Sequence, residues 1–407
     1  MKFLRTAPTG RLLAMIAGVV IAIVAGTAIA VAATSGGPVP RREPLATALH
    51  QALTAPAVTA ISARISFTNN LISSADFTGQ ASDPLLQGAP TGRLWMSKDA
   101  LRLELQSDNG DAEVLVRDGS FWISDPASNT VYEGTVPKDS ASTASSSKHA
   151  GQGPPSIAQL QKEITRLMAR VDLAGATSSD PEDIAGRAAY SVRISPKHSG
   201  GELGALQLAW DAVKGIPLDV AVYARGNATP ALELKVTDIS FASSPSDFDI
   251  TPPAGDKVVK IDTASTAGAS RALKHGHAKT QVSGVGAVAK HLTFPLTAPA
   301  SVVGLPRHGV TLMNWGGSPA ALVTYGKDLG GIAVIEQKAP AGSSAPSSSS
   351  GTGNLSLPTV SIDGATGQEL ATELGTMLRV THDGVAYTVV GSVTPYAAEA
   401  AARALIG

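Results

Sequence analysis

The sequence contains no cysteine, which excludes disulfide bonds, thiolate metal sites, cysteine nucleophiles and a lipid-modified cysteine anchor. Aromatic residues are scarce, at 4% of the chain, and charged residues make up 16%. The formal net charge is −1, so the chain lacks the basic footprint of a nucleic-acid-binding protein, and no nucleic-acid partner is expected. Because 43% of the 407 residues are hydrophobic, we expect two or three domains held together by core burial.

Motifs of the common hydrolases are also missing, since neither a G-x-S-x-G elbow nor an H-E-x-x-H zinc motif occurs. Residues 284–289 match a dinucleotide-binding fingerprint only loosely and lack a preceding strand and a βαβ frame. His275 and His277 have no nearby carboxylates and are interpreted as a solvated pair rather than as metal ligands. We therefore predict a protein without enzymatic activity, cofactor or bound metal.

Residues 12–33 lack charge altogether. This apolar run of about 22 residues is long enough to cross a hydrocarbon core of about 30 Å as one helix. The basic residues Lys2, Arg5 and Arg11 precede it, which predicts a cytoplasmic N-terminus and an extracytoplasmic bulk. Small-x-small sequences near residue 30 are candidate cleavage sites. Residues 1–33 are therefore a transmembrane anchor of a single-pass cell-membrane protein, or a signal peptide whose removal leaves a secreted protein.

The rest of the chain divides by composition and periodicity into four parts. These are a tether (34–44), a main domain (45–255), a linker (256–285) and a smaller α+β domain (286–407).

Apolar–polar alternation predicts two antiparallel meanders in the main domain, over residues 101–132 and 189–241. Helical periodicity predicts amphipathic helices over 45–55 and 157–171. Asp118-Gly119 and Lys214-Gly215 are predicted hairpin turns. The smaller domain is expected to contain the strands 320–325, 332–337 and 385–393 and a closing helix, 395–406.

Three segments carry a more specific pattern: VRDGSFWISDPASNTVY at 116–132, AWDAVKGIPL at 209–218 and FDITPPAG at 248–255. Together with the leading helix and the two meanders, they resemble the lipoprotein-carrier superfamily of LolA-type carriers, RseB-type stress regulators and LolA-like proteins of Gram-positive bacteria. The resemblance implies an α+β fold over residues 45–255. In that fold a strongly curved antiparallel sheet, an open half-barrel, wraps around helices and leaves an apolar cavity for acyl chains or for an apolar segment of a partner.

The tail, with GATGQELATELG at 364–375 and VAYTVVG at 385–391, resembles a small C-terminal domain of some LolA-like and sporulation-type membrane proteins. That family has no defined chemistry to carry over.

Candidate ligand-binding residues are the apolar positions of the first meander and of the segment just before it, because a curved sheet with apolar concave positions suits a lipid cavity. These are Leu94, Met96, Leu101, Leu103, Leu105, Val114, Val116, Phe121 and Ile123. The alternative is that they pack on helices and leave no space, since alternation indicates burial and not vacancy.

The resemblance and the apolar run together predict a membrane-tethered extracytoplasmic binding protein whose ligand is a lipid or lipoprotein acyl chain. Two alternatives remain open. One is an RseB-like envelope-stress regulator that contacts a membrane anti-sigma factor, and the other is a scaffold without a cavity.

Overall fold

The computed structural model describes the chain in fourteen stretches. They are residues 39–71, 90–107, 110–125, 129–135, 156–168, 171–174, 180–197, 201–242, 244–248, 255–261, 282–315, 318–327, 330–339 and 357–407. Within these stretches no helix has both the length and the apolar character needed to cross a bilayer. The predicted membrane segment, residues 12–33, lies outside the described residues, as do His275 and His277.

The larger sheet contains thirteen strands in the spatial order β13-β6-β5-β4-β3-β2-β1-β12-β11-β10-β9-β7, and β8 also pairs with β9. The pairing is antiparallel except between β13 and β6, which run parallel. The strands are β1 (Ala60–Asn69), β2 (Thr91–Ser97), β3 (Ala100–Ser107), β4 (Gly110–Arg117), β5 (Ser120–Asp125), β6 (Thr130–Thr135), β7 (Val171–Ala174), β8 (Asp180–Ile184), β9 (Arg187–Pro196), β10 (Leu203–Asp211), β11 (Pro217–Ala224), β12 (Pro230–Ser240) and β13 (Lys257–Ile261).

The smaller sheet contains eight antiparallel strands in the order β14-β15-β16-β17-β21-β20-β19-β18. Helix α8 (Pro395–Ile406) packs on one face of it and buries Ala398, Ala401, Ala402 and Leu405. The strands are β14 (Ser301–Val302), β15 (Leu305–Trp315), β16 (Ser318–Tyr325), β17 (Ile332–Lys338), β18 (Thr359–Ile362), β19 (Ala365–Thr372), β20 (Gly375–His382) and β21 (Val385–Gly391). A short helix, α7 (Val285–Ala289), contributes the fully buried Val288.

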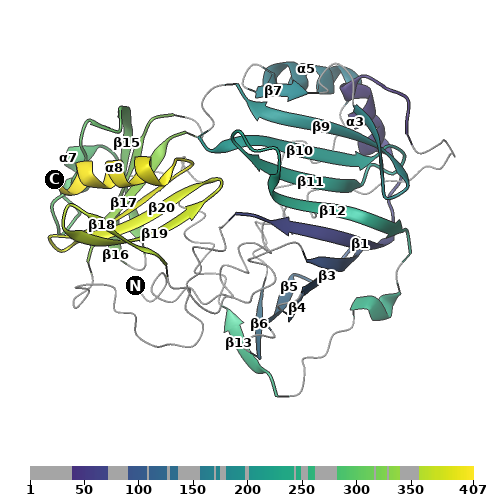
Figure 1. Ribbon diagram of the computed structural model, residues 1–407, viewed down its shortest axis with the longest axis horizontal. Helices are drawn as coiled ribbons and strands as arrows, with labels where there is room; N and C mark the ends of the chain where they lie inside the picture. Colours follow the sequence, from purple (N-terminus) through teal and green to yellow (C-terminus); the bar gives the residue numbers. More distant parts are fainter. Residues whose placement is uncertain are drawn as a thin grey trace.

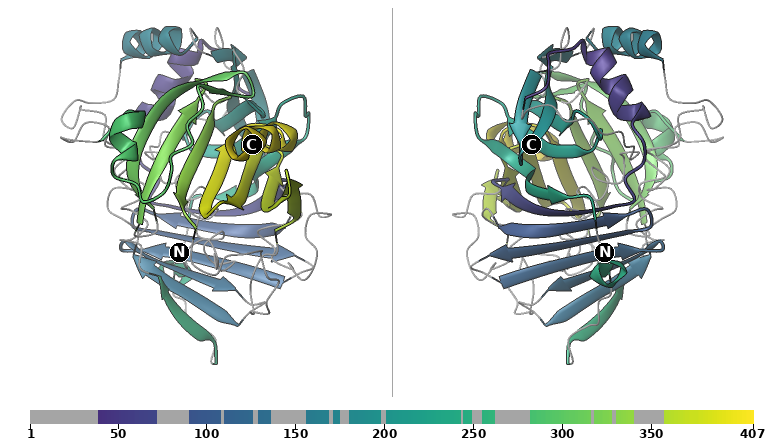
Figure 2. Two further views of the ribbon diagram at one scale, coloured as in Figure 1. Left: turned by 90° about the vertical axis from the view of Figure 1, so that its left-hand side faces the viewer. Right: turned by 90° about the vertical axis from the view of Figure 1, so that its right-hand side faces the viewer.

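Two helices, α3 (Leu45–Thr54) and α5 (Ile157–Leu167), lie together at the β9 end of the larger sheet (Figures 1 and 2). Helix α3 stops at Thr54 because Ala55, which precedes Pro56, takes an extended conformation. Helix α5 begins with a capping box, in which Ser156 Oγ accepts the Gln159 N–H and Gln159 Oε1 accepts the Ser156 N–H. The helices cover only this end of the sheet.

The predicted α+β class with a curved antiparallel sheet is confirmed. Strands β9–β12 face the viewer in Figure 1, whereas β2–β6 face the viewer in the views of Figure 2, which are turned by 90°. The Asp118-Gly119 turn is confirmed by positive φ angles of 52° and 75°. The helix predicted over 157–171 ends earlier, at Leu167, and Val171 instead begins β7. Lys257–Ile261, which we placed in the linker, forms β13 at the edge of the larger sheet.

The two sheets meet through loop tips. The Glu202 N–H donates to both the carbonyl and the hydroxyl oxygens of Ser392, at 3.0 and 2.9 Å. The Glu373 N–H donates to the Leu71 carbonyl at 2.8 Å, and Asn227 Nδ2 donates to the Glu373 carboxylate at 3.0 Å. The contact is therefore polar, and part of it depends on the backbone at Gly201 and Glu202.

Gly201→Ala is expected to separate the two domains. Gly201 has φ +67°, and an added Cβ would lie 1.9 Å from the Ser392 carbonyl oxygen. Because the chain has no cysteine, dyes can be attached at cysteines introduced at the exposed Lys98 and Tyr396. Energy transfer between the dyes should change in Gly201→Ala. Gly226→Ala is the control, because Gly226 has φ +75° with nothing within 4 Å. Equal energy transfer in both variants would contradict this role of Gly201.

Candidate apolar binding site

One face of the larger sheet, here called the inner face, is apolar across its whole width. Directly paired residues of antiparallel strands point to the same face, so register defines it. One row runs through Val192, Leu208, Val220, Leu234 and Phe67, from β9 to β1. A second row, from β1 to β6, contains Ala63, Leu94, Leu103, Val114, Ile123 and Tyr132.

Packing on the inner face differs between its two ends. At the β9 end, Tyr190, Val192 and Trp210 pack against Leu45, Ala48 and Ala52 of α3. At the β1–β6 end, the apolar side chains form a separate large cluster. Strands β10, β11 and β12 join the two clusters: Leu208 packs on the cluster at the β9 end, and Leu232 and Leu234 pack on the large cluster.

Strands β10, β11 and β12 carry apolar side chains on the inner face that are incompletely buried. Leu206 is 41% exposed, and its neighbours in register, Val222 and Leu232, are half-buried. Leu208, Val220 and Leu234 are likewise half-buried. We call these six residues the apolar band.

A small cavity of about 40 Å³ adjoins the apolar band, between β11–β12 and β1–β2. One water molecule needs about 10–15 Å³ of such space, so the cavity has room for only a few water-sized groups. The lining residues are Ile61, Ala63, Ile65, Leu94, Met96, Ile216, Pro217, Leu218, Asp219, Val220, Leu234, Val236 and Ile239. The cavity alone therefore holds no more than a very short apolar group, and a longer ligand has to use the apolar band as well.

The turn between β10 and β11 positions Ile216 and Leu218 at the cavity. Asp211, which is fully buried, accepts the N–H groups of Val213 and Lys214 at 2.8 and 2.7 Å and pairs with Arg187 Nε at 2.7 Å. These bonds explain the AWDAVKGIPL segment: the aspartate organises the turn and the glycine supplies the positive φ that closes it, at +66° for Gly215.

Asp219 is the ionisable residue among the lining positions. It alternates with Leu218 and Val220, so its carboxyl points to the opposite face, where it pairs with Lys235 Nζ at 3.7 Å. Burial raises the pKa of Asp219 to about 6, with Glu233 adding to the rise and Lys235 opposing it. The cavity wall is therefore apolar.

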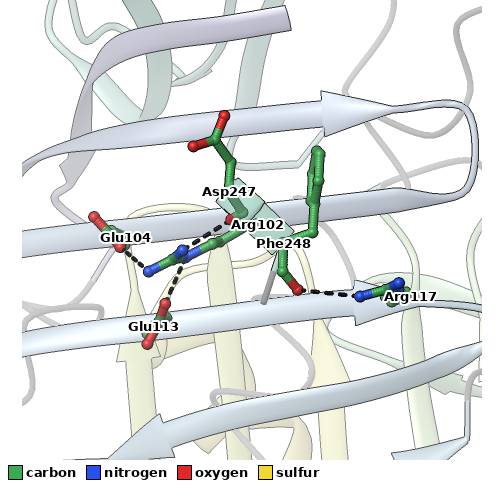
Figure 3. A network of polar contacts seen from close by, with 6 residues as sticks. All are labelled: Arg102, Glu104, Glu113, Arg117, Asp247 and Phe248. Atoms are coloured by element: carbon green, nitrogen blue, oxygen red, sulfur yellow. Dashed lines mark hydrogen bonds and ion pairs between the residues drawn. The ribbon is translucent and has the colours of Figure 1, made fainter. Parts of the chain in front are cut away.

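The outer face of the same sheet is occupied by a polar network (Figure 3). Arg102 pairs with Glu104 and with Glu113, donates to the Asp247 carbonyl at 2.8 Å, and lies over the Trp95 ring. Burial raises the pKa of Glu113, and Arg102 opposes that rise. The Asp247 carbonyl belongs to η3 (Pro245–Phe248), which crosses β3 and buries Phe248. This face is thus covered by the chain itself.

Of the predicted ligand-binding residues, the structure places Leu94 and Met96 at the cavity. The other seven belong to the same apolar cluster but do not line the cavity. Buried among them are Leu101, Leu103, Leu105, Val114 and Ile123, and partly buried are Val116 and Phe121. The prediction did not include the apolar band, although the alternation of Leu206, Leu208, Val220 and Val222 was visible in the sequence.

No family model matches the chain, and no curated protein matches it. Among solved structures, it is similar to the Pseudomonas aeruginosa MucA/MucB complex, with 15% identity, a TM-score of 0.38, and coverage of 88% of this chain and 95% of that one. It is also similar to a putative outer membrane lipoprotein-sorting protein domain from Vibrio parahaemolyticus (12%, TM-score 0.19, coverage 47% and 89%). A third similar structure is a LolA superfamily protein from Nitrosomonas europaea (8%, TM-score 0.21, coverage 51% and 98%). MucB and a LolA-superfamily protein are thus among the structures found similar to this chain, and at these identities and TM-scores no ligand or partner is carried over.

Proposed function

We propose that this protein binds an acyl chain of a lipid or lipoprotein on the inner face of its larger sheet, without catalysis, and that residues 12–33 tether it outside the cytoplasm. The observation that supports the proposal is the apolar band, in which Leu206 is exposed and the other five aliphatic side chains are half-buried next to an apolar cavity. A chain lying across β10, β11, β12, β1 and β2 would span about 19 Å, because neighbouring strands lie about 4.8 Å apart.

The energetics suit such a ligand. Each buried CH₂ contributes about 0.8 kcal/mol, so eight methylenes on the band give about 6 kcal/mol. That free energy corresponds to a dissociation constant of tens of micromolar, which allows the acyl chain to bind and dissociate reversibly.

Leu206→Glu is expected to weaken binding of a fluorescent fatty-acid probe at least tenfold while the protein stays folded, because the side chain is 41% exposed and the carboxylate keeps its water. Val390→Glu is the matched control. Val390 is also 41% exposed but lies on β21 of the smaller sheet, so probe affinity should not change. Probe fluorescence titration gives both affinities.

Three results would count against the proposal. Equal loss in both variants would place binding elsewhere, and no loss in Leu206→Glu would remove the band from the site. A wild-type protein that binds no probe would contradict the lipid proposal, and capture of a membrane anti-sigma protein would then support the regulator alternative.

A further inference from the structure

The smaller domain buries a carboxyl group that the proposed lipid site does not use. Glu336 lies on β17, in the interior of the smaller sheet, and is 0% exposed. It lies two and four residues after Val334 and Ile332 of the domain core, so it shares their face of the strand, on the α8 side. A buried carboxyl is costly in its ionised form unless hydrogen bonds or a cation compensate it.

The group that meets this carboxyl belongs to residues 292–300, here called the covering segment, which connects α7 to β14. The Thr297 N–H donates to Glu336 Oε2 at 2.8 Å. Thr297 Oγ1 also lies 3.1 Å from the Tyr387 hydroxyl. The segment packs Leu292, Phe294 and Leu296 on the core, although it forms no regular secondary structure. The segment is therefore held on the sheet by these apolar contacts together with a few polar ones.

A second anchor binds the end of the covering segment. Arg307 donates to the carbonyls of Ala298 and Pro299, and its N–H donates to the Ala300 carbonyl at 2.8 Å. The Arg307 guanidinium is engaged with these carbonyls, and Arg403 of α8 pairs with Asp363 and Glu399. Neither arginine forms an ion pair with Glu336 within the described residues.

Apart from the Thr297 N–H, no hydrogen-bond donor stabilises an ionised Glu336 carboxylate within the described residues. Its Oε1 and the Tyr325 hydroxyl have no hydrogen-bond partner in the described part of the chain. Burial raises the pKa of Glu336 to about 7, opposed only by the Thr297 N–H. The pKa values of Tyr325, at about 12, and of Tyr387 are raised by burial and, further, by the Glu336 charge, so both phenols stay neutral. Asp383 adds to the rise in the pKa of Tyr387, and Asp363 and Glu399 are acids that pair with Arg403 of α8.

We propose that Glu336 makes the docking of the covering segment sensitive to pH: the segment is closed while the carboxyl is neutral and opens as the carboxyl ionises. Opening exposes Glu336 to water and removes the cost of its charge. The opened and closed forms differ only in the placement of residues 292–300 over the sheet.

The direction of the effect follows from linkage. In the closed form the carboxyl titrates near pH 7, and in the open form near its ordinary value of 4.5. Below both values it is neutral in both forms and closure is most stable. Between them each pH unit favours opening about tenfold, and above pH 7 the effect levels off, so opening should rise about 100-fold from pH 5 to pH 8.

Hydrogen exchange of the full-length protein in detergent tests this, with each observed rate divided by the intrinsic rate at that pH. Peptides covering residues 292–300 should show the 100-fold rise, and Glu336→Gln should abolish the pH dependence. Thr297→Val is the matched control: it removes the hydroxyl contact with Tyr387 but keeps the amide, so it should open more at every pH with the same slope.

A wild-type segment whose opening does not change between pH 5 and pH 8 overturns the proposal, whether or not Glu336→Gln folds. The same slope in peptides of β17 and β21 would also overturn it, because the carboxyl would then be exposed by unfolding of the whole domain. Retention of the slope in a folded Glu336→Gln variant would assign the titration to another group.

Discussion

Leu103→Glu is expected to destabilise the larger domain severely. Leu103 is 4% exposed and lies between Leu94 and Val114 in the second inner-face row. A carboxylate there loses its water and gains no cation, at a cost of several kcal/mol. That cost is a large part of the 5–15 kcal/mol that holds a typical domain folded, so about half or more of the stability should disappear.

The measurement is urea unfolding followed by tryptophan fluorescence. Three of the four tryptophans, Trp95, Trp122 and Trp210, lie in the larger domain, so Trp315→Phe gives a background that reports on this domain alone. Leu206→Glu in the same background should shift the unfolding midpoint little. A stable Leu103→Glu protein that no longer binds the fatty-acid probe would instead place an open cavity over β2–β5.

Asp211→Ala should destabilise the same domain by about 3 kcal/mol. It removes one acceptor shared by Val213 and Lys214 and the carboxylate that pairs with Arg187. A lost partner leaves each buried N–H with a penalty of about 1–3 kcal/mol, while Arg187 is 31% exposed and recovers part of its hydration.

Asp211→Asn is the control for charge. The amide oxygen still accepts the two N–H groups of the turn, so the loss should be less than half as large. The unfolding midpoint in urea should fall in that order at constant slope. Equal losses in the two variants would show that the Arg187 ion pair, and not the turn, determines the stability here.

Much of the larger sheet could be predicted from the sequence, because apolar and polar residues alternate in strands that bury only one face. Leu101, Leu103 and Leu105 were assigned to a strand and to one face, and both assignments are confirmed by register with β4. Strand β2 was missed for the opposite reason. Leu94, Trp95 and Met96 are all buried, since the outer face is covered as well, and this removes the alternation.

The site was harder to predict than the fold. Alternation reports which face a side chain takes, but the exposure of Leu206 depends on how far α3 and α5 extend across the sheet. The parallel pairing of β13 depends on a tertiary contact with Thr130–Thr135, more than 100 residues earlier, that no local pattern of KVVKI contains. The contact between Glu336 and Thr297 could not be predicted either, because the sequence of the strand does not indicate which segment covers Glu336.

The pairing of β1 with β12 also has a consequence for how the chain folds. The strands β2–β6 and β9–β12 each join neighbours in sequence and can form early, whereas β1 needs Leu232–Ser240 to complete one of its edges. During synthesis, β1 therefore has an unpaired edge until more than 160 further residues have emerged. Arg64, which is exposed on β1, places a charge on that unpaired edge, and the charge discourages pairing with another chain.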